Sequence, residues 1–340
     1  MINRKKIKKK IIILLAAAIA IFVYAVLSIK VLNHFPAQID LKHRSGEFGA
    51  TFSKKFCDEL GLDWKNTYIA VLDELKVRNL RLPVYWDEVE KIENVYDFSD
   101  MDYMINEASS RQTKMIITLG RRQPRWPECH SPAWNNKKTP IETNISILNM
   151  IKAVVLRYQN NPNIVAWQVE NEAFLSSFGV CPPLDQNLLQ QEVNLVKSLD
   201  SRPIIITGSG EMSSWKKEAA MGDIFGTTMY RVVYNGTLGY IRYSFPTYFY
   251  QLKAKLAGIE ADKAIIIELQ TEPWVPRGNM IYLTEDQINK SMSVAQFKAN
   301  LQYAIDVNFN QIYVWGVEWW YWQKLYGNPE YFEIGKTLFN

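Results

Sequence analysis

The sequence predicts an α/β domain, a (β/α)₈ barrel in which eight parallel strands each lead into a helix, preceded by an N-terminal transmembrane helix. Short apolar runs alternate with segments of helical period throughout residues 46–340, as repeated βα units require. No glycine-rich phosphate-binding turn follows an early strand, which disfavours an open doubly wound sheet. No internal repeat or linker divides these residues, so we expect a single barrel.

The predicted strands are short runs of β-branched and other apolar residues, as expected for strands that are buried on both faces. In chain order they are Phe48–Phe52, Asn79–Pro83, Met115–Gly120, Ile164–Val169, Pro203–Thr207, Ile224–Tyr230, Ala264–Leu269 and Gln311–Trp315. The segments between them repeat apolar residues at helical spacing. The predicted helices are Asn66–Val77, Asp100–Arg111, Ser146–Tyr158, Asn187–Leu199, Tyr248–Leu256 and Ser293–Val307, the last opening with a capping-box pattern.

The N-terminus combines a basic cluster with a long uncharged segment. The basic residues are Arg4, Lys5, Lys6, Lys8, Lys9 and Lys10, and Ile11–Ile29 carries no charge. Such a segment can cross a bilayer as a helix of about 20 residues, and positive flanks stay inside. We therefore expect a basic cytoplasmic tail (1–10), a signal-anchor (11–29), a linker (30–45) and an extracytoplasmic catalytic domain (46–340) of a single-pass cell-membrane protein. A cleaved secretory signal and a buried soluble helix are the alternatives.

The charge and the cysteines exclude several classes of protein. Without its six N-terminal charges the chain falls from +4 to about −2, so a nucleic-acid partner is not expected. The three cysteines are not spaced along the chain as the ligands of a metal site are. If the domain is extracytoplasmic one disulfide is allowed, and Cys129 with Cys181 is the favoured pair over Cys57, with unpaired thiols as the alternative. The three histidines are scattered, and we predict no metal and no cofactor.

Two predicted strands end abruptly in a carboxylate. The fourth leads into Glu170-Asn171-Glu172, and the seventh ends in Glu268. A buried strand does not finish on Glu unless the charge faces a solvated pocket or a partner. Because barrel enzymes place catalytic residues at the carboxyl ends of their strands, these ends predict paired catalytic carboxylates, as cleavage of a glycosidic bond requires.

Other polar and aromatic residues follow strand ends on the same predicted face. Polar groups that bond hydroxyls, together with indoles that stack on sugar rings, are typical of a carbohydrate pocket. The predicted substrate-binding residues are Arg81, Arg122, Asn171, Tyr230, Glu272, Trp274, Trp315 and Trp319. Arg122 belongs to a cluster with Arg121 and Arg125 that could equally be a solvated loop.

One passage carries a family resemblance. Arg157-Tyr158-Gln159-Asn160-Asn161-Pro162-Asn163-Ile164-Val165-Ala166-Trp167, followed by Asn171-Glu172, resembles the approach to the fourth strand in glycoside hydrolase clan A. These are retaining (β/α)₈ enzymes that include cellulases, mannanases and β-galactosidases. The resemblance covers residues 46–340 and implies that Glu172 is the acid/base, that Asn171 bonds the sugar 2-hydroxyl and that Glu268 is the nucleophile. It further implies that Arg81 and Tyr230 contact that nucleophile.

Two features depart from the clan pattern. The third strand leads into Gly120-Arg121-Arg122, where many cellulase-like members carry a histidine, and the sixth lacks the histidine that often accompanies its tyrosine. We therefore assign the clan and leave the sugar and the linkage open.

The catalytic assignments each have a rival nearby. Glu170 shares a strand face with Glu172, and Glu172 is favoured because it follows Asn171 and lies beyond the apolar run. Glu272 would lie on the same face of an extended strand as Glu268. Glu268 is favoured as the nucleophile because it directly follows the apolar run of the strand. Glu272 is then expected to contact substrate.

The sequence thus predicts a retaining glycoside hydrolase that cleaves β-glycosidic bonds of an oligo- or polysaccharide by double displacement. An envelope-remodelling transglycosylase and a non-catalytic carbohydrate-binding barrel are the alternatives. Exo or endo action is left open, because it depends on loop geometry.

Overall fold

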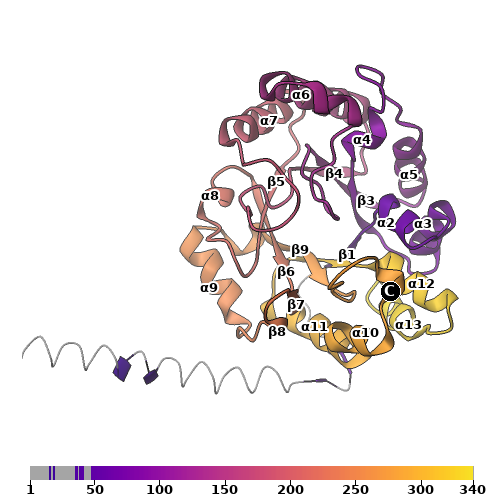
Figure 1. Ribbon diagram of the computed structural model, residues 1–340, viewed down its shortest axis with the longest axis vertical. Coiled ribbons are helices and arrows are strands. Elements are labelled where there is room, and N and C mark those ends of the chain that lie inside the picture. Colours follow the sequence, from indigo (N-terminus) through magenta and orange to yellow (C-terminus); the bar gives the residue numbers. More distant parts are fainter. Residues whose placement is uncertain (1–14, 17, 20–34, 37, 42–46, 340) are drawn as a thin grey trace, which may run out of the picture.

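A computed structural model describes residues 15–16, 18–19, 35–36, 38–41 and 47–339. Eight parallel strands close a barrel in the order β1-β10-β9-β6-β5-β4-β3-β2, and helices surround them (Figure 1). The predicted (β/α)₈ barrel is therefore confirmed.

The barrel strands match the predicted runs to within one residue at each end. They are β1 Glu47–Thr51, β2 Asn79–Pro83, β3 Lys114–Leu119, β4 Ile164–Val169, β5 Ile204–Gly208, β6 Ile224–Met229, β9 Ala264–Gln270 and β10 Gln311–Trp315. The agreement is close because a strand covered on both faces is a continuous apolar run, with a visible start and stop.

Helices follow the strands, and four of the six predicted helices match to within one residue at each end. The helix predicted at Asn66–Val77 begins two residues and ends four residues earlier than expected, and six further helices were not predicted. The helices are α2 Lys54–Glu59, α3 Trp64–Asp73, α4 Trp86–Val89, α5 Ser99–Ser110, α6 Pro140–Tyr158, α7 Gln186–Leu199, α8 Lys216–Ala219, α9 Tyr248–Ala257, α10 Glu285–Met292, α11 Val294–Val307, α12 Val317–Leu325 and α13 Glu330–Lys336. Helix α6 starts six residues before its predicted start, because Thr139 and Glu142 form a capping box around Pro140. At α11 only half of the predicted box forms: Ser293 caps Gln296 N–H, while the Gln296 side chain bonds Asn300.

The sequence did not predict the antiparallel hairpin of β7 (Val232–Asn235) and β8 (Gly239–Arg242). This hairpin lies in the loop that leads from β6 to α9. Asn235, the last residue of β7, and Gly236, the first of the turn, form a dipeptide favoured in tight hairpins, so a local signal was present. The hairpin contributes to a wall of the cavity described below.

The barrel interior changes from apolar to polar towards the carboxyl ends of the strands. Six buried residues from five strands form a separate inner cluster: Ile116, Ala166, Ile205, Ile265, Ile267 and Tyr313. Above them the interior holds Arg81 and Gln168, both fully buried. The larger core lies between strands and helices, so packing fixes the strands and leaves their carboxyl ends for polar side chains.

The predicted membrane segment, residues 11–29, lies outside the described residues except for Leu15, Ala16, Ala18 and Ile19. The part of the chain that the structure describes contains no helix with the length and apolar character needed to cross a bilayer.

Candidate active site

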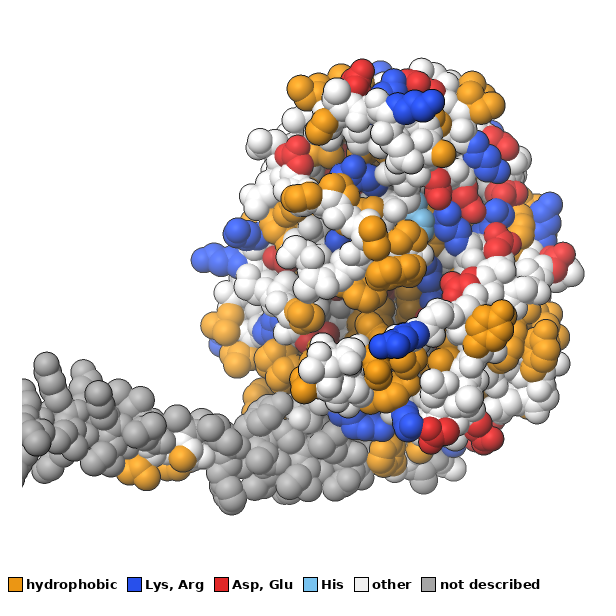
Figure 2. Space-filling model, in the orientation of Figure 1, with side chains coloured by type: hydrophobic (Ala, Val, Ile, Leu, Met, Phe, Trp, Pro, Cys, Tyr) orange, Lys and Arg blue, Asp and Glu red, His pale blue; other side chains and the backbone are white. Residues whose placement is uncertain are grey.

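A cavity of about 330 Å³ opens at the carboxyl ends of the barrel strands. Its walls combine carboxyl groups with aromatic and aliphatic side chains, and the space-filling view shows hydrophobic side chains around the hollow on this face (Figure 2). The lining residues used below are Glu128, Glu172, Phe178, Glu211, Tyr230, Glu268 and Trp274. Carboxyls beside apolar rings are what a sugar-binding cleft needs.

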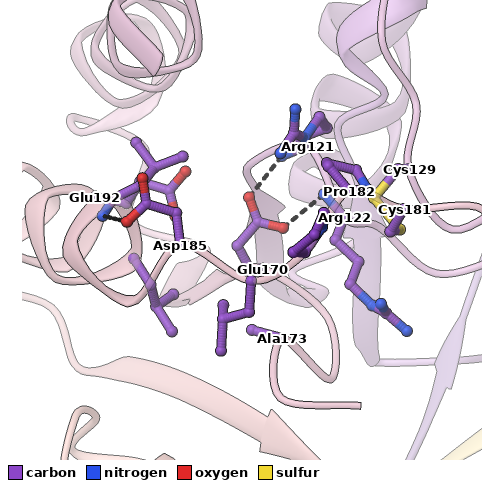
Figure 3. Close-up of a pocket in the computed structure, with 13 residues that line it drawn as sticks. Arg121, Arg122, Cys129, Glu170, Ala173, Cys181, Pro182, Asp185 and Glu192 are labelled. Carbon is purple, nitrogen blue, oxygen red and sulfur yellow. Dashed lines mark hydrogen bonds between the residues drawn. A yellow bond between two sulfur atoms is a disulfide. The ribbon is translucent and has the colours of Figure 1, made fainter. Parts of the chain in front are cut away.

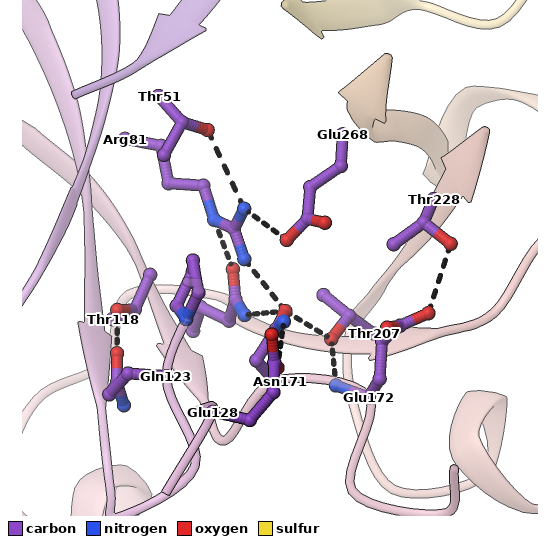
Figure 4. Close-up of polar contacts among 12 residues, drawn as sticks. Thr51, Arg81, Thr118, Gln123, Glu128, Asn171, Glu172, Thr207, Thr228 and Glu268 are labelled. Atoms are coloured by element: carbon purple, nitrogen blue, oxygen red, sulfur yellow. Dashed lines mark hydrogen bonds and ion pairs between the residues drawn. The ribbon is translucent and has the colours of Figure 1, made fainter. Parts of the chain in front are cut away.

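Glu172 enters the cavity from the turn after β4. Its backbone N–H donates to Thr207 Oγ1 on β5 at 2.8 Å, and its Oε1 accepts from Thr228 Oγ1 on β6 at 2.9 Å (Figure 4). Burial and then the negative charge of Glu268 raise the pKa of Glu172 to about 8. The carboxyl is therefore protonated at neutral pH and can donate a proton.

Glu268 reaches the same cavity from β9 because the strand is irregular there. Ile265 and Ile267 belong to the inner cluster, so simple alternation would turn Glu268 outward. The pairing of β9 with β6 shifts by one residue between Ile266 and Glu268, and this extra residue turns Glu268 into the barrel. Its oxygens accept from Arg81 Nη1 at 2.8 Å and from Tyr230 Oη at 3.0 Å.

Arg81 connects three strands beneath the cavity. Its Nη1 binds Glu268, its Nε donates to Gln168 Oε1 at 2.8 Å and its Nη2 donates to Asn171 Oδ1 at 2.8 Å. The guanidinium thus compensates the charge of Glu268 and fixes the Asn171 amide. The Asn171 Oδ1 also accepts from Thr207 Oγ1 at 3.3 Å, which leaves its Nδ2 directed to Glu128 (Figure 4).

Sequence reasoning missed two carboxyls of the cavity, Glu128 and Glu211. Burial, followed by the charges of Glu268 and Glu172, raises the pKa of Glu128 well above its usual range. Burial also raises the pKa of Glu211 to about 7, and this carboxylate accepts from Tyr250 Oη at 2.5 Å. Glu128 lies in an irregular loop, where the local signal was that it precedes Cys129. Glu211 stands three residues after the buried strand β5, so its place beyond an apolar run was a signal that sequence reasoning did not use.

Glu170, the rival of Glu172, faces away from the cavity. Its two oxygens accept from the backbone N–H groups of Arg121 and Arg122 at 2.7 and 2.6 Å (Figure 3). Gly120 permits this approach, since a Cβ there would lie 2.3 Å from Glu170 Oε1. Glu170 therefore holds the loop after β3 through the backbone N–H groups of Arg121 and Arg122.

The structure does not bring Glu272 to the cavity. The carboxylate pairs with the buried Arg125, with Nη2 and Oε2 at 3.1 Å, and Arg125 also binds Glu318 at 3.4 Å. The Arg125 guanidinium lies 4.0 Å from the ring centre of Trp315. This network occupies both Glu272 and Trp315, so their predicted contact with substrate is not supported by their positions.

Arg122 and Trp319 also lie away from the cavity. Arg122 Nη2 donates to the carbonyl of Phe178 at 3.0 Å, because the loop after β4 folds over it. Trp319 is fully buried and packs on Tyr331 with ring centres 4.6 Å apart, because α12 begins directly after β10 and turns this face towards the core. Among the predicted binding residues, Tyr230 and Trp274 line the cavity, and Arg81 and Asn171 support its floor.

A disulfide joins the loops that border the cavity. Cys129, after β3, is bonded to Cys181, after β4, which is the pairing that the sequence favoured. Cys57 is buried and unpaired. Within the described residues, no group of three or more His, Cys, Asp or Glu side chains could hold a metal ion.

The buried Glu172 has a consequence for stability. Well below pH 4.5, the ordinary pKa of a glutamate, its carboxyl is protonated in the folded and unfolded states alike. As the pH rises towards 8 only the unfolded state ionises, so the free energy of unfolding falls by up to about 1.4 kcal/mol per pH unit. We expect the melting temperature of Glu172→Gln to rise relative to wild type between pH 5 and 8, measured by calorimetry.

Glu142 provides a control with the opposite sign. The backbone N–H and hydroxyl of Thr139 lower the pKa of this exposed carboxyl, so Glu142→Gln should lose stability relative to wild type as the pH rises. A difference between Glu172→Gln and wild type that is independent of pH would contradict the assignment for Glu172.

The chain was compared with known proteins. The family model described as Cellulase (glycosyl hydrolase family 5) matches residues 47–235. Mannan endo-1,4-beta-mannosidase F of Aspergillus fumigatus is 31% identical over 121 residues, which are 33% of this chain and 26% of that protein. Beta-galactosidase BgaA of Clostridium cellulovorans is 24% identical over 194 residues, 48% of this chain and 28% of that protein. The matches thus span about a quarter of these curated relatives.

Solved structures agree with the fold. GH5_18 from Bifidobacterium longum superposes with a TM-score of 0.57 at 11% identity, covering 80% of this chain and 69% of that one. At this level of identity the likeness supports the barrel alone.

Proposed function

This chain belongs to the cellulase family, glycosyl hydrolase family 5, and on that premise we propose that it hydrolyses β-glycosidic bonds with retention of anomeric configuration. Glu172 is the acid/base and Glu268 the nucleophile. The observation that carries the proposal is that two carboxyls of one cavity have opposite environments. The pKa of Glu172 is raised to about 8, because burial and the charge of Glu268 outweigh the opposing charge of Arg122, whereas Glu268 forms an ion pair with Arg81. Such divergence separates an acid from a nucleophile.

The proposed reaction has two steps. Glu172 donates its proton to the leaving oxygen while a Glu268 oxygen attacks the anomeric carbon, and a covalent glycosyl-enzyme forms. Forming this ester removes the charge of Glu268, which is one of the causes that raise the pKa of Glu172. Glu172 can then accept a proton from the attacking water, which releases the sugar and restores both groups.

The names of the relatives suggest which substrates to test first. We propose a panel of aryl β-mannosides, β-galactosides and β-glucosides, with the first-formed product followed by proton NMR. The β-anomer should appear before mutarotation. Initial release of the α-anomer would contradict retention, and failure to hydrolyse any β-glycoside or β-glycan would contradict the proposed function. Products longer than the substrate would instead indicate transglycosylation.

The dependence of kcat/KM on pH tests whether Glu172 is the acid, because the neighbouring Thr228 affects the pKa of Glu172. The Thr228 hydroxyl bonds the Glu172 carboxylate and thereby opposes the rise in its pKa. Thr228→Val removes this bond with little change in shape, so the pKa of Glu172 should rise further. Because activity requires protonated Glu172, we expect the alkaline limb of kcat/KM to lie near pH 8 in wild type. In the variant it should move to higher pH by about one unit.

Thr227→Val is the matched control for this shift. Thr227 is equally buried, but its hydroxyl donates to the carbonyl of Thr228 at 2.8 Å and does not touch Glu172. An alkaline limb that moves equally in both variants, or in neither, would argue against Glu172 as the acid.

We also propose that residues 11–29 anchor the chain in the cell membrane, with the barrel outside the cytoplasm. The basic residues before this uncharged segment support that orientation. The Cys129–Cys181 disulfide supports it independently, because disulfides persist mainly in oxidising compartments. Full-length protein should stay with membranes in alkaline carbonate, and external protease should degrade the barrel of intact cells or spheroplasts. Release into the soluble fraction, or a barrel protected from protease, would contradict the proposal.

A further inference from the structure

Glu128 is a carboxyl of the cavity that the reaction proposed above does not use. Its side chain is 5% exposed and lines the cavity together with Glu172 and Glu268. One oxygen, Oε2, accepts a long bond of 3.5 Å from Asn171 Nδ2. Within the described part of the chain its other oxygen accepts no hydrogen bond. A carboxyl this buried is expected to have partners for both oxygens, so Glu128 lacks a donor on the cavity side.

The surrounding loops are built to hold Glu128 at this place. Cys129, the next residue, is bonded to Cys181 across the two loops, and Val180 N–H donates to the Pro127 carbonyl at 2.9 Å. Gly179 lies against the Glu128 side chain, where a Cβ would come within 2.7 Å of Glu128 Cγ. The Glu128 backbone has φ of +74°, a conformation that side-chain-bearing residues adopt only when their surroundings enforce it.

Glu128 lies close to the two glutamates proposed to act on the anomeric carbon. Among the residues that the structure describes, Asn171 is the one side chain that hydrogen-bonds Glu128. It directly precedes Glu172 and accepts from the same Arg81 that holds Glu268. When the ring carbon next to the attacked anomeric carbon faces Asn171, its substituent also faces Glu128, because Asn171 Nδ2 donates to Glu128 Oε2. The substituent on that carbon is the ligand group best placed to supply the missing donor.

We propose that Glu128 binds the sugar unit that is transferred to the enzyme, by accepting a hydrogen bond from a donor on the carbon next to the anomeric carbon. The donor is a hydroxyl or a protonated amine, and Glu128 thereby determines which sugars the enzyme accepts. This assignment rests on the proposed function. The disulfide and Gly179 act through Glu128 by positioning its side chain.

The assignment is tested by a thermodynamic cycle in which the Glu128 carboxyl, the donor on carbon 2 of the substrate, or both are removed. Aryl β-glycosides with a 2-hydroxyl, a 2-amino group or no substituent at carbon 2 are compared with wild type, Glu128→Ala and Glu128→Gln. We expect Glu128→Ala to lower kcat/KM about 10- to 100-fold on the substrate carrying the donor, and less than about threefold on the 2-deoxy substrate. The intrinsic reactivity of each glycoside cancels in the cycle. An equal loss on all three substrates overturns the assignment.

The glutamine variant distinguishes the two donors. A glutamine amide still accepts from a hydroxyl, so Glu128→Gln should keep most of the activity on a 2-hydroxy substrate. The ammonium group of a 2-amino substrate favours the ionised form of Glu128 against the burial that raises its pKa. Glutamine cannot ionise, so a preference of wild type for that substrate should be lost.

Two controls separate binding from structure. Glu218→Gln replaces an equally buried glutamate that does not line the cavity, and it should leave the cycle unchanged. Cys129→Ser with Cys181→Ser should lower kcat/KM in wild type but add little in the Glu128→Ala background, whereas a purely structural role would give equal losses in both. If the enzyme hydrolyses glycosides but the loss in Glu128→Ala does not depend on the substituent at carbon 2, only the role of Glu128 is overturned. Absence of hydrolysis on every glycoside overturns the proposed function and this inference with it.

Discussion

Glu268→Gln is expected to lower kcat/KM on every β-glycoside by at least about 10⁴-fold, the scale of loss when a nucleophile is removed. The amide oxygen can still accept from Arg81, and the amide nitrogen can donate to the Tyr230 hydroxyl oxygen, at the places where the two Glu268 oxygens now accept, so the loss should occur without unfolding. The direct measurement is labelling with a 2-deoxy-2-fluoro glycoside, which should trap a covalent ester on Glu268. In Glu268→Gly, added azide should restore turnover and give an α-glycosyl azide, because azide attacks from the face that Glu268 occupied.

Glu272 is the control, because it was the rival nucleophile and lies on the same peptide. Fragmentation of the labelled peptide must therefore resolve the two glutamates. Glu272→Gln should retain turnover within about tenfold but lose stability, since it weakens a buried ion pair with Arg125 and such losses cost about 3–5 kcal/mol when the pair is fully broken. A label on Glu272, or loss of turnover only in its variant, would reverse the assignment.

Glu172→Ala should slow the reaction by about 10²–10⁴-fold, the usual contribution of general acid–base catalysis, with a strong dependence on the leaving group. Glycosides of acidic phenols need no proton at the departing oxygen, so their rate of glycosyl-enzyme formation should change little. Glycosides of alkyl alcohols or sugars should suffer the full loss. The measurement is a plot of log kcat/KM against the leaving-group pKa, which should be steeper for the variant than for wild type.

Azide again separates the two roles. In Glu172→Ala it should attack the glycosyl-enzyme from the face opposite Glu268 and give a β-glycosyl azide. Glu170→Gln is the matched control: it lies two residues away, but its carboxylate bonds backbone groups of the loop after β3. It should leave the leaving-group dependence as in wild type. An equal loss on good and poor leaving groups in Glu172→Ala would contradict its role as the acid.

The sequence by itself determined the barrel and the strand that carries Glu172. The strand limits could be read to within one residue because a strand packed on both faces is apolar throughout, and this pattern is local. Glu172 was identifiable for the same reason, since it stands just past an apolar run and next to Asn171. The hairpin of β7 and β8 was missed because its short strands are only partly buried, so they lack that pattern.

The tertiary structure decided which polar side chains share the cavity. Glu268 faces inward only because β9 shifts its register against β6, and Arg81 reaches it across the barrel. Glu272 is drawn to Arg125, 147 positions away in the chain, and Trp319 is directed to the core by the start of α12. Glu128 enters the cavity because a disulfide closes two loops around it. Apolar periodicity is set by neighbours in the chain, whereas the partner of a charge is set by whichever distant residue the fold brings within hydrogen-bonding distance.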